Sequence, residues 1–158
     1  MFEKICIQSS KKEYSVVFLD NCLSSGLKSD IKSHFIVDKN VFNLNKDFFL
    51  DLQSSNNLLI IDATEKNKSL NKLTPYVEEL VKQGIKRHEK IVAIGGGIIQ
   101  DISCFLATTI LRGIEWEFIP TTLLSQSDSC IGSKSSINVG DFKNILGTFS
   151  PPKKIIID

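Results

Sequence analysis

The sequence predicts an α/β fold with a Rossmann-like, open and mainly parallel sheet that carries helices on both faces. Short apolar runs rich in β-branched residues alternate with longer stretches of helical period, as expected for strands joined by crossover helices. One such run, IVAI at 91–94, ends in three glycines directly before a helical pattern. A length of 158 residues is sufficient for one ordinary core, so we expect one domain over residues 1–158.

Six runs of valine, isoleucine, leucine and aromatic residues are the expected strands. They span residues 14–18, 34–37, 58–61, 91–94, 116–119 and 154–158. Parallel strands bring their carboxyl ends to one edge of a sheet, and ligands of open α/β sheets bind at that edge. We therefore expect a ligand site where these runs end.

Two amphipathic helices are expected between these runs. In the first, Ser69 is the predicted N-cap and Gly84 lies near the end. Its predicted apolar face consists of Leu70, Leu73, Val77, Leu80 and Val81. The second follows the glycines, and its predicted apolar face consists of Ile102, Phe105, Leu106, Thr109 and Ile110. This spacing of three and four residues predicts that each helix buries one side on the sheet.

Two segments have no clear period. Residues 44–57 are polar and loosely patterned, which predicts a weak helix or a loop. Residues 120–152 carry many hydroxyls and glycines with a few charges, and we expect them to line a site.

Composition excludes several classes of function. The chain is 42% hydrophobic with a net charge of +1, so electrostatics give no reason to expect nucleic acid or a membrane as partner. No apolar run approaches the roughly 18 residues of a membrane span, and the N-terminus lacks the order of a signal peptide. We expect a cytoplasmic protein with a small-molecule ligand. The four cysteines and two histidines are too widely spaced for a metal motif, so no metal site is expected in this chain.

The glycines at 95–97 are the first candidate site. Glycines at a strand-to-helix turn let backbone N–H groups approach a phosphate at the helix N-terminus. A tight turn without a ligand is the alternative, and the run is not a GxGxxG fingerprint. Other polar residues follow the strands. Asp38 and Asn40 follow one strand, and Asp62, Glu65 and Lys68 follow another. The carboxylates among them could hold ribose hydroxyls, and solvated loop residues are the alternative. Thr121 and Thr122 offer two hydroxyls at the end of a further strand, where a simple turn is the alternative.

A second candidate cluster combines three cations with a carboxylate and an amide. Its members are Arg112, Asp128, Lys134, Lys143 and Asn144. Arginine and lysine suit phosphate and carboxylate groups, whereas the aspartate and the asparagine suit sugar hydroxyls. A scatter of surface charge is the alternative interpretation.

Four stretches together carry a family resemblance. GGGIIQD, LRG, IPTTLLSQSDSCIGSK and KNILGTFSPP fall in order over about sixty residues, and their order and spacing resemble the 3-dehydroquinate synthases among the sugar phosphate cyclases. VDKN at 37–40, with Glu65 and Lys68, extends the resemblance to nearly the whole chain.

The resemblance implies an N-terminal NAD-binding domain, followed in the complete enzyme by a helical domain that carries the ligands of a divalent metal, zinc or cobalt. It implies that NAD is contacted by Asp38, Asn40, Glu65, Lys68, Gly95, Gly96, Gly97, Asp101, Thr121 and Thr122. It implies that the substrate is contacted by Arg112, Asp128, Lys134, Lys143 and Asn144. The implied reaction is elimination of phosphate from a seven-carbon sugar acid phosphate and ring closure, with NAD recycled, in the shikimate pathway.

Three departures from the family pattern leave the substrate open. Gln100 stands where glycine is usual, Ser133 replaces the second glycine of GGK, and INVGDFKN lacks the usual histidine or proline. A paralogous cyclase with another sugar phosphate is therefore an alternative. A polyol or glycerol phosphate dehydrogenase and a non-catalytic nucleotide-binding module are two more. The oligomeric state stays open, a homodimer included.

The chain stops at Asp158, where the metal-bearing domain of the family begins. We therefore expect a fragment or truncated product that binds no catalytic zinc and turns over no substrate alone.

Overall fold

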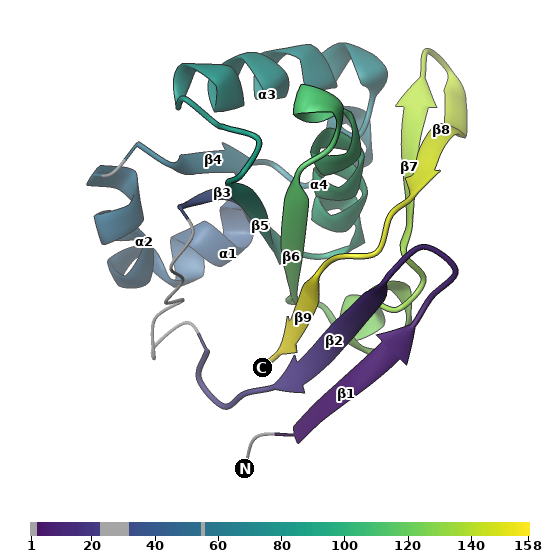
Figure 1. Cartoon of the computed structure of the whole chain (residues 1–158). Helices are drawn as coiled ribbons and strands as arrows, with labels where there is room; N and C mark the ends of the chain where they lie inside the picture. The colour runs from purple at the N-terminus through teal and green to yellow at the C-terminus, as the bar shows by residue number, and fades with distance from the viewer. Residues whose placement is uncertain (1–2, 23–31, 55) are drawn as a thin grey trace.

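A seven-stranded sheet forms the centre of the protein, in the order β1-β2-β9-β6-β5-β3-β4 (Figure 1). The computed structural model describes residues 3–22, 32–54 and 56–158. The strands are β1 (Glu3–Gln8), β2 (Glu13–Phe18), β3 (Ser33–Asp38), β4 (Leu58–Ile61), β5 (Lys90–Gly95), β6 (Glu115–Pro120) and β9 (Lys154–Ile157). β1 and β2 are antiparallel, and the other pairs are parallel. The predicted fold class is confirmed, and all six predicted runs are strands.

The central strands are aligned so that their carboxyl ends lie together. Val37 of β3 is opposite Ile94 of β5, and Gly95 at the end of β5 is opposite Pro120 of β6. Every residue of β5 is buried, as expected for a strand that is covered on both faces. This register brings the residues that follow β3, β5 and β6 to one edge.

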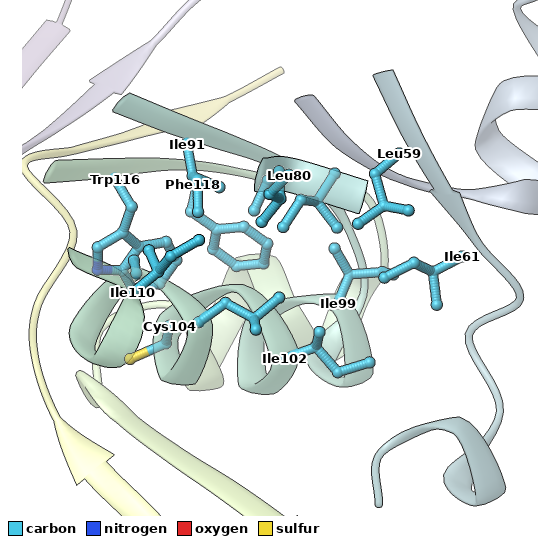
Figure 2. Close-up of a cluster of buried hydrophobic side chains, with 14 of the residues drawn as sticks. Leu59, Ile61, Leu80, Ile91, Ile99, Ile102, Cys104, Ile110, Trp116 and Phe118 are labelled. Carbon is cyan, nitrogen blue, oxygen red and sulfur yellow. The ribbon is translucent and has the colours of Figure 1, made fainter. Parts of the chain in front are cut away.

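Helices cover both faces of the sheet. α1 (Lys39–Leu44) and α2 (Lys46–Ser54) lie on one face, where Phe49 is fully buried in a cluster with β-strand residues. α3 (Leu70–Lys82) and α4 (Gly97–Thr109) lie on the other face, and Figure 2 shows Ile99 and Ile102 of α4 beneath the sheet. The segment predicted as a weak helix or loop contains α2. Within the described ranges, no helix has the length and apolarity to span a membrane.

α3 buries a narrower face than its pattern predicts. Leu73 and Leu80 are buried, whereas Leu70 is 39% exposed and Val81 is 58% exposed. Ser69 occupies the N-cap position, but its side chain forms no capping hydrogen bond. The predicted face was therefore too wide, since only its central positions are buried.

α4 is buried on more than the one side that the sequence predicts. A hairpin of β7 (Lys134–Val139) and β8 (Phe142–Phe149) packs against the helix beside the sheet (Figure 1). The small or polar residues Gln100, Ser103, Cys104 and Ala107 are therefore buried as well. Short side chains on this side of α4 allow the hairpin to approach closely. The hairpin lies in the segment predicted only as site lining, and a register shift between Ile137 and Val139 interrupts its pairing.

A buried cluster of polar side chains lies at the amino ends of the parallel strands, opposite to the ends where the glycines lie. His34 is fully buried, with Nε2 2.8 Å from Glu89 Oε2 and Nδ1 3.3 Å from Gln83 Oε1. The backbone N–H of Lys86 also donates to Glu89 Oε2 at 2.9 Å. Burial alone would raise the pKa of Glu89, but the hydrogen bonds from His34 and Lys86 and the charge of His34 together lower it.

Glu89→Gln should therefore destabilise the fold at neutral pH by about 2 kcal/mol, a value within the range for a hydrogen bond to a charged group. The pKa of Glu89 is lower in the folded state, so its contribution is present above its unfolded value and is lost as pH falls through the folded value. Urea unfolding at pH 7 and at pH 3 would measure this, and the difference from wild type should shrink at pH 3. Glu78→Gln, on the exposed side of α3, is the control and should change little at either pH.

Candidate functional site

The three glycines connect β5 to α4, and each has a different surrounding. A Cβ on Gly95 would lie 2.5 Å from Ile99 Cγ1, and a Cβ on Gly96 would lie 2.9 Å from Thr122 Cγ2. A Cβ on Gly97 would meet nothing within 4 Å, and this residue is exposed. Close packing therefore requires the first two glycines, whereas the third leaves open space beside the helix.

The N-terminus of α4 points its backbone donors into this space. Gly96 is the N-cap, and no side chain caps the helix. The first N–H groups of a helix have no partner within it, and the helix dipole adds positive potential at this end. Together with the open space at Gly97, this arrangement can bind an anionic group such as a phosphate.

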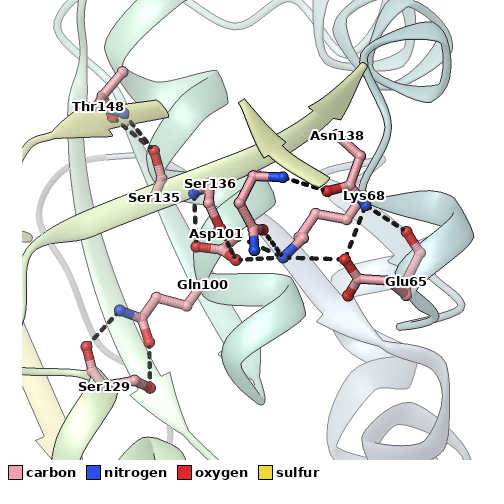
Figure 3. Close-up of polar contacts among 10 residues, drawn as sticks. Glu65, Lys68, Gln100, Asp101, Ser129, Ser135, Ser136, Asn138 and Thr148 are labelled. Atoms are coloured by element: carbon pink, nitrogen blue, oxygen red, sulfur yellow. Dashed lines mark hydrogen bonds and ion pairs between the residues drawn. The ribbon is translucent and has the colours of Figure 1, made fainter. Parts of the chain in front are cut away.

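Lys68 connects three separate parts of the chain beside the glycines (Figure 3). Its side chain is only 8% exposed. The ammonium lies 3.0 Å from Asp101 Oδ2 on α4, 3.0 Å from Asn144 Oδ1 on β8 and 3.4 Å from Ser136 Oγ on β7. Glu65 Oε1, in the 3-10 helix η1 (Glu65–Asn67), is 3.4 Å away. These oxygens occupy the donors of the ammonium, so Lys68 holds the site together.

The two carboxylates of this network have further donors. Asp101 Oδ1 accepts from the backbone N–H of Ser136 at 2.9 Å, and Asp101 Oδ2 accepts from Ser136 Oγ at 3.0 Å. Asn138 Nδ2 donates to Glu65 Oε1 at 2.8 Å. This hydrogen bond, against an opposing effect of burial and with help from Lys68, lowers the pKa of Glu65. The lowered pKa favours the ionised form of Glu65, and the hydrogen bonds hold both carboxylates in fixed positions.

A pocket of about 350 Å³ lies between this network and the glycine turn. Its walls include Gly97, Gln100, Asp101, Ser129, Lys68 and Lys134. A second hollow of about 490 Å³ includes Glu65, Asn138 and Lys143 in its walls. Glu65 and Asn138 belong to the network around Lys68, so both hollows are bordered by residues of this network.

Most of the residues predicted as NAD contacts surround the turn. Asp38 lies beside Gly95, since its Cβ is 3.2 Å from the position of a Cβ there. Its Oδ1 caps α1 through the N–H of Asn40 at 2.8 Å. The N–H of Thr121 donates to Gly95 O at 2.9 Å. The hydroxyl of Thr122 donates to Ser125 Oγ at 2.9 Å, so it has a structural partner.

The predicted substrate residues are not all brought together. Lys134 lines the pocket, Asn144 binds Lys68, and Lys143 lines the second hollow. Asp128 is exposed in the π-helix η3 (Ser125–Ser129), next to the pocket wall.

Arg112 is placed at the other end of α4 from the glycines, in the 3-10 helix η2 (Ile110–Arg112). α4 has 13 residues, so a rise of about 1.5 Å per residue puts roughly 20 Å between the glycines and this end. The structure therefore does not bring Arg112 to the glycine turn, because α4 lies between them, and its role as a substrate contact stays a prediction.

Sequence reasoning missed Ser136 and Asn138, which are the hairpin's contribution to the network. The available signal was the alternation of polar Lys134, Ser136 and Asn138 with Ser135 and Ile137, which indicates a strand with one polar face. In the described part of the chain, no group of three or more histidine, cysteine, aspartate or glutamate side chains could hold a metal ion.

Comparisons with known proteins identify the family. A family model described as the N-terminal part of 3-dehydroquinate synthase matches residues 58–158. The 3-dehydroquinate synthase of Pelagibacter ubique (strain HTCC1062) is 34% identical, over 98% of this chain and 45% of the relative. The chain spans about half the length of the curated relatives it matches.

Two solved structures of sugar phosphate cyclases have the same fold. The 2-epi-5-epi-valiolone synthase of Streptomyces hygroscopicus subsp. jinggangensis 5008, solved with NAD+ and Zn2+ bound, is 27% identical with a TM-score of 0.78, over 92% of this chain and 42% of that one. A 2-deoxy-scyllo-inosose synthase is 24% identical with a TM-score of 0.81, over 100% of this chain and 47% of that one. The chain belongs to the 3-dehydroquinate synthase family and corresponds to the N-terminal part of its members.

Proposed function

We propose that this chain is the NAD-binding part of a 3-dehydroquinate synthase-like sugar phosphate cyclase. The observation that carries the proposal is the glycine turn, where an uncapped helix N-terminus opens beside the pocket of Lys68, Asp101 and Lys134. Family membership supports it, as does the NAD+ bound in the related valiolone synthase. The reaction proposed for the complete enzyme is elimination of phosphate from a seven-carbon sugar acid phosphate, followed by ring closure.

The residues at the turn fit a dinucleotide. The space in front of Gly97 admits a diphosphate that the helix N-terminus can bind, while packing excludes a side chain at Gly95 and at Gly96. Asp38 and Asn40, at the end of β3, are proposed to hold ribose hydroxyls, and their position beside the turn supports this role. When bound, NAD would supply the hydride acceptor that makes the substrate's elimination chemically accessible. The chain itself binds and orients the cofactor.

The second proposal for this site concerns the substrate. Lys134 lines the pocket beside the glycine turn, Asn144 binds Lys68, and Lys143 lines the second hollow. With Asp128, these residues are proposed to position the substrate's anionic groups and hydroxyls. The described residues offer no metal site, so we assign no step to a metal in this chain. Gln100 lines the pocket, and Ser133 directly precedes Lys134 in its wall. Because both residues depart from the family pattern, the substrate should be tested with more than one sugar phosphate.

NAD+ binding to the 158-residue chain is the direct test. Calorimetry should detect saturable binding, and NAD+ at 100 times its dissociation constant should stabilise the fold by about 2.7 kcal/mol, since it binds the folded state. ADP and inorganic phosphate are the comparison ligands, and the dinucleotide should bind more tightly than either. A melting temperature that does not change with NAD+, together with no calorimetric signal, would count against the proposal.

Replacing Lys134 or Lys143 should lower catalysis without an equal loss of NAD+ affinity. In a protein that includes the second half of the relatives, Lys134→Ala and Lys143→Ala should each lower kcat/KM by about tenfold or more, or about 1.4 kcal/mol. Their NAD+ affinity should change much less. Lys82→Ala, on the exposed end of α3, is the matched control. Near-normal kinetics in both variants would reduce the two lysines to solvated surface charges.

A further inference from the structure

A reciprocal pair of hydrogen bonds joins α4 to the segment that forms the opposite wall of the pocket. Gln100 Nε2 donates to the carbonyl oxygen of Ser129 at 2.7 Å, and Ser129 Oγ donates to Gln100 Oε1 at 2.9 Å (Figure 3). Gln100 is only 3% exposed. A short, reciprocal and buried pair of this kind fixes the separation of the two backbones it joins.

The π-helix η3 is tied down at its other end too. The N–H of Ser125 donates to Thr122 Oγ1 at 3.2 Å, and Ser125 Oγ donates to Thr122 O at 2.9 Å. Only five residues lie in η3, and Ser125 and Ser129 are its first and last. The Gln100 pair therefore fixes the one end of η3 that faces α4. Single π-helical turns are frequent at functional sites.

Both partners of this pair line the pocket beside the glycine turn. Gln100 and Ser129 stand in its wall together with Gly97 and Asp101, and Asp128 directly precedes Ser129 in η3. The distance between α4 and η3 is thus a dimension of the pocket, and the pair spans it.

We propose that Gln100 is a positioning residue that holds η3 against α4 and so sets the width of the pocket for the part of a dinucleotide beyond its diphosphate. The inference rests on the proposed NAD site, and it assigns a role to one of the residues that departs from the family pattern. A primary amide is suited to this role, because it offers a donor and an acceptor on one planar group. A carboxylate at this position would face the carbonyl oxygen of Ser129 without a proton to donate.

The test compares Gln100→Ala, Gln100→Glu and wild type in two measurements on the 158-residue chain. Hydrogen exchange of the amides of residues 125–130 reports on the clamp without any ligand. Dissociation constants for NAD+ and ADP report on the pocket, because ADP ends at its diphosphate. Ser103→Ala is the control, since Ser103 lies buried one turn further along α4 and its hydroxyl has no hydrogen-bond partner among the described residues.

In both Gln100 variants, the amides of residues 125–130 should exchange faster. NAD+ should bind about tenfold more weakly, which is the loss of affinity expected when about one buried hydrogen bond is lost. Their ADP affinity should stay within about twofold of wild type, and Ser103→Ala should match wild type in every measurement. Equal loss of NAD+ and ADP affinity would indicate general destabilisation and overturn the positioning role. Unchanged exchange at 125–130 would overturn the clamp. If the wild-type chain bound neither nucleotide, the proposed function would fail, while hydrogen exchange would still decide whether Gln100 holds η3.

Discussion

Gly96→Val should abolish NAD+ binding by this chain. A Cβ at this position would lie 2.9 Å from Thr122 Cγ2, closer than a normal contact, and valine adds two more methyl groups. Thr122 cannot easily yield, because its hydroxyl and backbone N–H are bonded to Ser125. The variant must therefore push apart the end of β6 and the start of α4, where the diphosphate is proposed to bind. Calorimetry with NAD+ measures the loss.

The neighbouring glycines separate the effect on binding from the effect on folding. Gly95→Ala should destabilise the fold itself, because the new methyl would lie 2.5 Å from Ile99 Cγ1 in the core. Gly97→Ala should keep the melting temperature of wild type, since its methyl enters open space, yet bind NAD+ at least about tenfold more weakly because the ligand needs that space. Gly132→Ala, whose nearest atom would be an ordinary contact at 3.6 Å, should leave folding and binding intact.

These outcomes distinguish a phosphate site from a tight turn. If Gly97→Ala bound NAD+ as well as wild type, the space in front of α4 would not be the binding site. If Gly96→Val lost binding only in proportion to its loss of folded protein, the glycine would serve packing alone. Circular dichroism of each variant at the temperature of the titration provides the necessary comparison.

The sequence was sufficient for the fold because its signals are local. Runs such as 91–94 and 116–119 are continuous and apolar, which is what strands buried on both faces require. β1 was missed because KICIQ, at the edge of the sheet, alternates without a strong apolar face: Ile5 is 45% exposed and Cys6 is exposed. Edge strands are held by one neighbour and carry a weaker pattern.

The site was less predictable because it depends on tertiary contacts. The positions of Glu65, Lys68 and Asp101 near the glycines follow from the parallel register, which a sequence pattern can indicate. The contribution of Ser136 depends on a hairpin that folds back over α4, and the separation of Arg112 depends on the direction of that helix. Neither can be derived from spacing alone, because spacing along the chain does not specify the side on which a later segment returns.

Lys68→Met should cost about 3 kcal/mol of folding free energy, the low end of the range for breaking a buried ion pair. The methionine would retain most of the buried stem but remove the ammonium that Asp101, Asn144, Ser136 and Glu65 share. Asp101 would keep the two donors of Ser136 and lose its counter-ion, with its side chain only 18% exposed. The loss should weaken the attachment of the hairpin to α4 and lower NAD+ affinity as a consequence.

A double-mutant cycle with Asp101→Asn isolates the ion pair. If charge is the link, the double variant should be less destabilised than the sum of the two single variants, by about 1 kcal/mol or more. Urea unfolding midpoints at constant slope measure each term. Lys72→Met, on an exposed position of α3, is the control and should stay within about 0.5 kcal/mol of wild type. If the losses of unfolding free energy were additive, or if Lys68→Met cost no more than Lys72→Met, the ammonium would not stabilise the site through the ion pair. A coupled loss would show that one buried cation holds η1, α4 and the hairpin in the arrangement from which the pocket is made.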